Sequence, residues 1–305
     1  MKAEEERTSE NRVELAELIA SHCKGEGILE AAEGLALVRL SSPTPPHHGL
    51  YSPAICVIAQ GAKEVQLGDE RYRYDPAHYL ICALDVPIIS QVVEATPEKP
   101  YLSLKLNLDP ALVASVSIET SVSPKSDNSV RAMNVNELHG DLLDAFVRLV
   151  RLLEKPADYM AISPMVLREI IYRLLATDEG PRLRQMAVFG GHTNRIAKAV
   201  DTLKTKFDQD LRIEDLARDL GMSVSSFHQH FKTATSMSPL QFQKQLRLQE
   251  ARRLLLFEGF DASSAAERVG YDDASQFSRE YKRLFGDPPT RDLARFKQLS
   301  PATRQ

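Results

Sequence analysis

The sequence predicts an α+β protein with two domains, on the strength of three observations. Short apolar segments punctuated by Gly, Pro and Asp fill much of the first half, which is typical of strands. Longer segments with helical periodicity fill the second half. The C-terminal part also repeats one residue pattern, which indicates a supersecondary unit used twice. A chain of 305 residues is long enough for about two hydrophobic cores.

The first domain is expected at residues 13–180 and begins with a short amphipathic helix over 13–22, after a segment that is disordered or frayed. Gly68-Asp69 is expected to form a hairpin turn within the strands that follow. Such closely spaced strands predict an antiparallel sandwich or barrel. The strands are expected at 35–40, 54–59, 63–67, 71–74, 79–83, 88–95 and 101–108.

Two helices are expected after the strands. Leu142 and Phe146 belong to an apolar stripe over 138–153, which packs in the core or also contacts a second subunit; the sequence leaves both open. Ser163-Pro164 is expected to begin the next helix, with Ser as the cap, and this helix runs to about Ala176. A linker containing Gly-Pro and Gly-Gly pairs is expected between the domains.

The repeat compares residues 213–232 with residues 262–282. In each copy a short helix ends at a glycine, Gly221 or Gly270, which can take the left-handed backbone that stops a helix. A polar turn follows, and Ser223 is well placed to cap the next helix. Each copy is therefore predicted to be a helix-turn-helix.

The second helix of each copy carries an aromatic pair spaced by four residues, which predicts one buried face. The opposite face is polar, with side chains that suit base edges and phosphates in the major groove. The aromatic pairs are Phe227 with Phe231, and Phe277 with Tyr281. The candidate base contacts are Ser225, His228, Gln229, Ser275, Gln276 and Arg279. The candidate phosphate contacts are Lys232, Arg247, Lys282 and Arg283.

Three segments in this region resemble the AraC/XylS family of transcription regulators. They are P-L-Q-F-Q-K-Q-L-R-L-Q-E-A-R-R-L-L from Pro239, V-G-Y from Val269, and S-Q-F-S-R-E-Y-K-R-L-F-G-D-P-P from Ser275. The resemblance implies a DNA-binding domain over 192–299, with helix-turn-helix units at about 213–234 and 262–285. A long joining helix of roughly 27 Å would place them in successive major grooves. Ser236 departs from the family, which usually has Gly there.

The first half resembles the N-terminal domain of one AraC subgroup. The matching segments are S-P-A-I-C-V-I-A-Q-G-A-K-E-V-Q-L-G from Ser52, Y-L-I-C-A-L-D-V-P from Tyr79 and E-K-P-Y-L-S-L-K-L from Glu98. The resemblance implies a cupin-like β-barrel with flanking helices, which binds an effector or mediates dimerisation. The effector-binding residues are not identified by the resemblance.

Charge is distributed unevenly along the chain. The net charge is -4, but the part from Gly190 onward has 19 basic and 15 acidic residues, so the acidic excess lies in the first half. A basic C-terminal part suits phosphates. The absence of an apolar leader or membrane-length segment, together with three cysteines, predicts a cytoplasmic protein without membrane association.

No catalytic motif is present, so we expect no enzymatic activity and no cofactor. His47-His48 lacks the spacing of a cupin metal site, and no metal is expected. Cys56 and Cys82 lie in apolar strands, where a buried thiol is the usual state, and a sensing role stays open.

These observations predict a sequence-specific regulator that binds promoter or operator DNA, forms a homodimer and responds to a small-molecule effector. RNA polymerase is a further partner if the regulator is an activator. Two alternatives stay open: a cupin-type enzyme with an accessory DNA-binding domain, and a regulator that binds no ligand and uses its first domain only for dimerisation.

Overall fold

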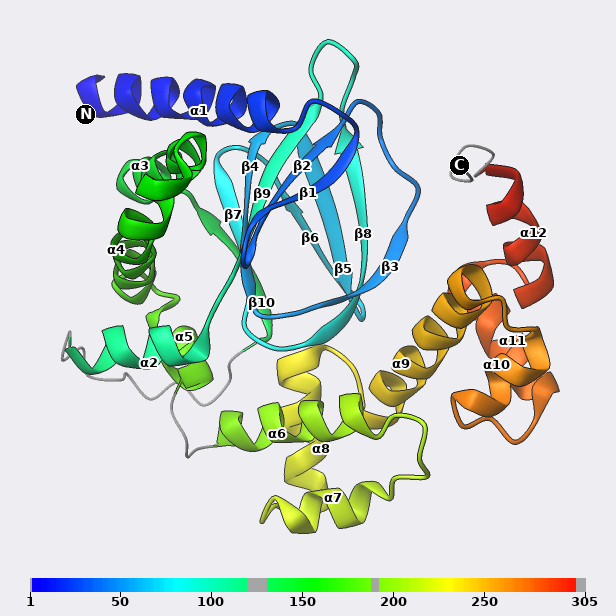
Figure 1. Ribbon diagram of the computed structural model, residues 1–305. Coiled ribbons are helices and arrows are strands. Elements are labelled where there is room, and N and C mark those ends of the chain that lie inside the picture. Colours follow the sequence, from blue (N-terminus) through cyan, green and yellow to red (C-terminus); the bar gives the residue numbers. More distant parts are fainter. Residues whose placement is uncertain (1, 120–130, 188–191, 300–305) are drawn as a thin grey trace. The chain divides into compact units, whose positions relative to one another are not determined.

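The computed structural model describes residues 2–119, 131–187 and 192–299 (Figure 1). The chain divides into two compact units. They comprise residues 1–197 with 233–236, and residues 198–232 with 237–305. All described strands belong to the first unit, and the second unit is helical. The change from strand to helix pattern along the sequence therefore predicted the α+β class correctly.

The described strands form two antiparallel sheets. The larger sheet has the order β1-β2-β9-β4-β7-β10, and the smaller has the order β3-β8-β5-β6. The strands of the larger sheet are β1 Gly27–Ala32, β2 Leu35–Leu40, β4 Ala54–Gln60, β7 His78–Cys82, β9 Tyr101–Asn107 and β10 Met133–Glu137. Those of the smaller are β3 His47–Tyr51, β5 Ala62–Leu67, β6 Glu70–Tyr74 and β8 Val86–Glu94.

A closed barrel, which the family resemblance implied, is not what the strands form. In the described part of the chain no ladder joins one sheet to the other, so β1 and β10 are edges of the larger sheet and β3 and β6 are edges of the smaller. Alternation of inward and outward side chains is the same in a sandwich and in a barrel. The sequence pattern therefore could not decide closure, and of the two architectures it allowed, the structure has separate sheets.

The predicted strands all exist, and the strands that the sequence analysis missed are edge strands. The expected range 35–40 coincides with β2, and the others differ from the structure by one or two residues at an end. The missed strands β1, β3 and β10 each pair on one side only. Their residues are mostly half-buried or exposed, so they lack the buried alternation that marks the central strands.

The hairpin between β5 and β6 has the predicted two-residue turn. Leu67 pairs with Glu70, which leaves Gly68 and Asp69 as the turn. The φ angle of Gly68 is +57°, a conformation that a residue without Cβ adopts easily. Turn chemistry therefore fixes the register of this pair of strands.

The described residues of the first unit also include six helical segments. They are α1 Lys2–His22, α2 Pro110–Glu119, α3 Gly140–Arg151, the 3₁₀ turn η1 Leu152–Glu154, α4 Pro156–Leu175 and α5 Gly180–Ala187. The expectation of a disordered or frayed segment before residue 13 was wrong, because α1 begins at Lys2. Arg7 in this segment donates a 2.9 Å hydrogen bond to the Asp144 carboxylate on α3, and the two helices pack together.

Two further boundaries differ from the sequence analysis. Ser163-Pro164 does not begin a helix, because α4 starts at Pro156 and continues through Pro164. The Gly-Pro pair at 180–181 opens α5 rather than a linker, since proline is tolerated in the first turn of a helix. Leu183 of α5 is completely buried in the core of the first unit, which explains why this segment is ordered.

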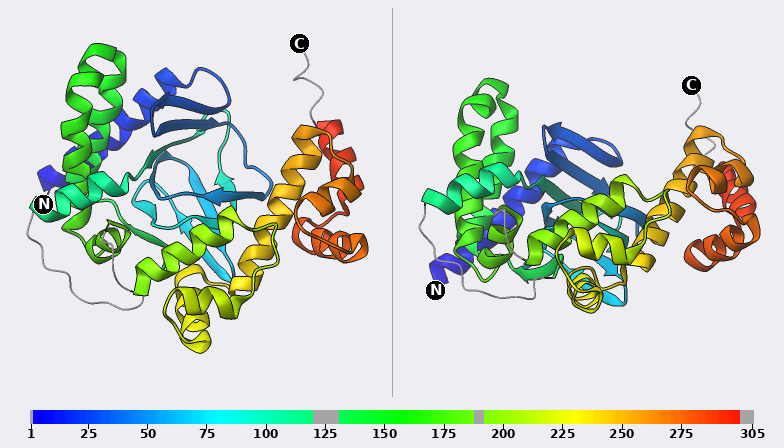
Figure 2. Two further views of the ribbon diagram at one scale, coloured as in Figure 1. Left: turned by 60° about the horizontal axis from the view of Figure 1, so that its bottom comes forward. Right: turned by 90° about the horizontal axis from the view of Figure 1, so that it is seen from below.

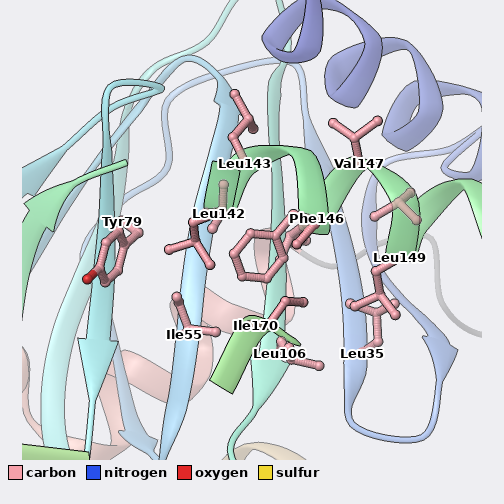
Figure 3. Packing of buried hydrophobic residues seen from close by; sticks show 14 of the residues in the cluster. Leu35, Ile55, Tyr79, Leu106, Leu142, Leu143, Phe146, Val147, Leu149 and Ile170 are labelled. Carbon is pink, nitrogen blue, oxygen red and sulfur yellow. The ribbon is translucent and has the colours of Figure 1, made fainter. Parts of the chain in front are cut away.

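The core of the first unit lies between the larger sheet and the helices α1, α3 and α4, which lie along one of its faces (Figure 1, Figure 2). Phe146 on α3 is fully buried, close to Ile55, Leu106 and Ile170 (Figure 3). Leu142, one turn earlier on the same helix, is buried as well. The apolar stripe of α3 is therefore core, and the hypothesis that it also forms a subunit interface was wrong.

Among the described residues of the second unit, every regular element is helical. The helices are α6 His192–Thr205, α7 Ile213–Asp219, α8 Val224–Thr235, α9 Pro239–Arg253, the π-helical segment η2 Leu254–Glu258, α10 Ala262–Arg268, α11 Ala274–Phe285 and α12 Pro289–Leu299; the first residues of α6 and the last of α8 cluster with the first unit. The long joining helix expected over 239–257 is present as α9 continued by η2. Across the described ranges, none of the helices combines the length and apolarity needed to cross a bilayer.

Truncation of Phe146 tests the position of the core. We expect Phe146→Ala to lower the free energy of unfolding of the first unit by about 3–5 kcal/mol, because a large buried ring leaves a cavity. Met160→Ala on α4 is the matched control, since that residue is 78% exposed and its truncation should cost about 0.5 kcal/mol or less. Urea unfolding followed by circular dichroism measures both. Equal effects would show that the α3 face is not core.

Candidate nucleic-acid interface

The first helix-turn-helix consists of α7 and α8. Gly221, which follows α7, has φ +63° and turns the chain after the helix, as the sequence predicted. The hydroxyl of Ser223 accepts a 3.3 Å hydrogen bond from the backbone N–H of Ser226, which confirms Ser223 as the cap of α8. Local chemistry alone therefore sets the turn between the two helices.

An aromatic cluster fixes which face of α8 points outward. Phe227 and Phe231 are fully buried with ring centroids 5.5 Å apart, and Phe231 meets Phe242 of α9 edge-on at 5.4 Å. The opposite face is consequently left to polar side chains. Ser225, Gln229 and Lys232 are exposed, and His228 is half-buried with its ring against Phe227.

The second helix-turn-helix, α10 and α11, is built in the same way. Gly270 ends α10 with φ +83°, and the carboxylate of Asp273 caps α11 by accepting a 2.7 Å hydrogen bond from the N–H of Ser275. The sequence analysis missed this cap, although an Asp directly before a helical pattern is the usual signal. Phe277 and Tyr281 are fully buried. The outward face carries exposed Ser275, Gln276, Arg279, Lys282 and Arg283.

The cations on α11 are available to a ligand. Within the described ranges, Arg279, Lys282 and Arg283 have no hydrogen-bond or ion-pair partner. The nearby carboxylate of Glu280 is instead held by Lys244 at 2.7 Å and by the Tyr271 hydroxyl at 2.7 Å. Burial alone would raise the pKa of Glu280, but these hydrogen bonds outweigh it and the pKa is lowered. This face therefore combines free positive groups with a carboxylate that is already neutralised.

Arg247, which the sequence analysis assigned to a phosphate, has a different role. Its guanidinium donates to three backbone carbonyls, those of Phe207 at 2.6 Å, Gly270 at 2.8 Å and Gln209 at 2.9 Å. Gln243, one turn earlier on α9, also donates to the carbonyls of Phe207 and Gln209. Arg247 therefore ties α9 to the segment before α7 and to the turn of the second hairpin, and we remove it from the proposed DNA contacts.

A buried ion pair joins α9 to α12. Arg252 donates to both carboxylate oxygens of Asp292, at 2.8 and 3.1 Å, and the Tyr281 hydroxyl donates to the same carboxylate at 2.8 Å. A charged run on a helix, such as the run from Glu250 to Arg253, is usually solvated surface. That is correct for the exposed Arg253 but wrong for Arg252, whose partner Asp292 is fully buried. The network fixes α11, because Tyr281 belongs to it.

Ser236 lies between α8 and α9 with φ +56°, the one non-glycine residue of the described ranges that has a positive φ. The next residues compensate by forming a capping box, in which Ser238 and Gln241 exchange side-chain and backbone hydrogen bonds at 2.9 and 3.3 Å. The serine at this position therefore leaves the start of α9 well formed, and the departure from the family pattern is accommodated.

The candidate sites of the first unit are not brought together. His47 and His48 are neighbours on β3 and project to opposite sides of the strand. In the regions that the structure covers, no three His, Cys, Asp or Glu side chains lie close enough to hold a metal ion. Cys56 and Cys82 are free and buried, and burial raises the pKa of Cys82 to about 12. A thiol in that state is poorly reactive, which confirms the buried-thiol interpretation.

Two family models match the chain. Residues 31–182 match the N-terminus of AraC-type transcriptional regulators, and residues 216–295 match a helix-turn-helix domain. The HTH-type transcriptional activator RhaS of Salmonella schwarzengrund is 30% identical over 149 residues, which are 48% of this chain and 52% of RhaS. The RhaS of Salmonella typhimurium matches to the same extent. The chain thus spans about half the length of these curated relatives.

Solved structures extend the comparison to the fold. Unsaturated fatty acid-bound ToxT from Vibrio cholerae aligns with a TM-score of 0.53 at 11% identity, over 89% of this chain and 97% of ToxT. This likeness shows a shared fold. The DNA-binding domain of AdpA, solved in complex with a target DNA, is 26% identical over 35% of this chain and 96% of that domain, with a TM-score of 0.33.

The role of Arg247 is tested by a substitution that keeps its charge. We expect Arg247→Lys to lower the free energy of unfolding of the helical unit by about 2–4 kcal/mol, because one ammonium cannot satisfy three carbonyls in this geometry. Arg279→Lys is the matched control and should change the stability by about 0.5 kcal/mol or less. Unchanged stability together with equally weakened binding to all DNA sequences would instead make Arg247 a phosphate contact.

Proposed function

The chain belongs to the AraC family of transcriptional regulators, and we propose that it binds specific double-stranded promoter or operator sequences and regulates transcription there. One observation carries the proposal: α8 and α11 both present an exposed polar face on the side opposite their buried aromatic pairs. A single chain therefore has two elements of the size and chemistry that enter a major groove. Since the family consists of regulators, the enzyme alternative is not retained.

The proposed division of work follows the chemistry of the exposed side chains. Base edges are assigned to Ser225, His228, Gln229, Ser275, Gln276 and Arg279. Phosphates are assigned to Lys232, Lys282 and Arg283. The planar fork of Arg279 suits the O6 and N7 atoms of guanine, whereas Lys282 is a flexible point charge that suits a phosphate. Residues 192–299 form the proposed DNA-binding domain, and RNA polymerase is a further partner if the regulator is an activator.

The proposed domain at residues 13–180 binds a small-molecule effector and dimerises. The polar side chains between the two sheets, among them Lys63 and Lys105, support the binding of an effector. The regulator that binds no ligand remains the alternative, and calorimetry against a panel of metabolites separates the two. A cytoplasmic location is part of the proposal, because all three cysteines are free.

The proposed homodimer uses α4 rather than α3. Ile162, Met165 and Tyr172 are exposed and lie on one side of α4, whereas the apolar face of α3 is already buried within the chain. An exposed apolar stripe on a helix is typical of an interface. Met160 is also exposed, at 78%, but helical geometry places it on a different side of α4.

Substitutions on α4 test this interface. We expect Met165→Lys combined with Tyr172→Lys to weaken the dimer at least tenfold while the fold is kept, because two charges replace apolar contacts. Met160→Lys should leave the dimer unchanged. Sedimentation equilibrium gives the dissociation constant. An unchanged dimer in the double variant would place the interface elsewhere, and a monomeric parent chain would remove the homodimer from the proposal.

Substitutions on α11 test DNA recognition. We expect Arg279→Ala to cost about 1–3 kcal/mol on the preferred sequence and to relax the preference at one base pair. Lys282→Ala should weaken all sequences about equally and reduce the salt slope by about one. A series of mutated operators at two salt concentrations measures both. A uniform loss with Arg279→Ala would make Arg279 a backbone contact, and no sequence preference in the parent would refute the proposed function.

A further inference from the structure

A cluster of polar side chains lies between the two sheets of the first unit. On β9 the leucines 102, 104 and 106 face the helices, so the alternate residues Tyr101, Ser103 and Lys105 face the smaller sheet. The same alternation directs Lys63 of β5 and Tyr74 of β6 toward the larger sheet, where Lys63 and Tyr74 both come close to the Cys56 thiol. The space between the sheets is therefore lined by polar groups as well as by apolar ones.

Two lysines in this cluster converge on one tyrosine. The ammonium of Lys63 donates a 2.9 Å hydrogen bond to the Tyr51 hydroxyl and lies 5.4 Å from the centre of the Tyr51 ring. The ammonium of Lys105, from the opposite sheet, lies 5.5 Å from the centre of the same ring. The aromatic face provides some stabilisation for a cation. It does not neutralise two of them.

No carboxylate of the described residues pairs with either ammonium. Neither Lys63 nor Lys105 takes part in an ion pair there, although surface charges of the same unit commonly do. Burial lowers the pKa of Lys63; the Cys56 thiol opposes this shift, and repulsion from Lys105 adds to it. Removing a charge from water, even in part, is costly unless a partner compensates it, and neither ammonium is fully exposed. The ammonium groups of Lys63 and Lys105 therefore lack a negatively charged partner among the described residues.

The surroundings indicate the kind of molecule that would supply this charge. Lys63, Lys105 and Tyr51 are only half-buried, so solvent reaches them. The rings of Tyr74 and Tyr101 beside them are fully buried, and their hydroxyls lie close to one another across the sheets. The two ammonium groups are therefore reached by solvent and have buried aromatic rings as neighbours.

We propose that Lys63 and Lys105 bind the carboxylate of a small organic acid, with Tyr51 positioned between them and the apolar part of the acid packed among the aromatic rings. The proposal deepens the proposed function, on which it rests, by giving the effector a chemical class. A single carboxylate between two ammonium groups forms charge-assisted hydrogen bonds to both. An inorganic phosphate offers the charge but no apolar part to pack.

Calorimetry on the full chain tests this site, with hexanoate, decanoate and benzoate as probes, their amides as neutral counterparts, and inorganic phosphate. We expect at least one carboxylate to bind, its amide to bind about tenfold more weakly or not at all, and phosphate not to bind. Lys63→Gln and Lys105→Gln should each weaken the carboxylate about 10- to 100-fold. Lys99→Gln, which removes the same charge from an exposed turn, should have no effect.

Several results would overturn the assignment. They are equal binding of acid and amide, binding of phosphate alone, no binding of any carboxylate, or unchanged affinity in both variants. The melting temperature without ligand separates a binding role from a structural one. Because each variant removes one of two repelling charges, it should melt no lower than the parent chain, and a clear fall would make the lysines part of the fold instead.

Measurements of DNA binding separate this proposal from the proposed function. Both lysine variants should bind operator DNA as the parent does when no ligand is present. If a neutral metabolite changed DNA affinity equally in the parent and in the variants, effector control would stand and the organic acid would be wrong. If the parent bound no specific DNA, the proposed function would fail whatever the calorimetry of the acids showed.

Discussion

The hydrogen bonds of Arg247 hold the geometry of the helical unit. Its guanidinium joins the backbone before the first hairpin to the turn of the second, by bonds to the carbonyls of Phe207, Gln209 and Gly270. Only glycine fits at position 270, because a Cβ there would lie 2.1 Å from the carbonyl oxygen of Asp208. The two hairpins are thus fastened to each other at their backbones and not through α9 alone. We infer that the contacts of Arg247 and Gly270 set the distance between α8 and α11.

The first unit uses the two faces of its larger sheet for different purposes. One face is covered by helices and filled with leucine, isoleucine and phenylalanine, and it supplies the cohesion of the unit. The other face, turned to the smaller sheet, includes Tyr101, Ser103, Lys105 and the thiols of Cys56 and Cys82. Strand alternation makes this division possible, because successive residues of one strand reach opposite faces. The hydrophobic core and the polar side chains therefore lie on opposite faces of the same sheet.

The sequence predicted the features that depend on local pattern. The central strands, the hairpin at Gly68 and the capped turn at Ser223 all follow from periodicity or turn chemistry. It did not predict features that depend on tertiary contacts between segments far apart in the sequence. Arg247 looked like a free cation because its three acceptors are backbone carbonyls, which carry no sequence signal. Lys63 and Lys105 converge only through the packing of two sheets, and their strands are far apart in the chain.

Because the two sheets are not closed into a barrel, each has edge strands, and an edge strand can pair with another copy of the protein. Strand β1 forms one margin of the larger sheet and carries Ile28, which is 72% exposed, and Leu29, which is 40% exposed. An apolar strand with unpaired backbone groups along one side is a template for adding a further strand. Its sequence, G-I-L-E-A-A, has a single charge to oppose such growth. The margin at β1 is therefore where concentrated preparations of the protein would begin to form intermolecular β-structure.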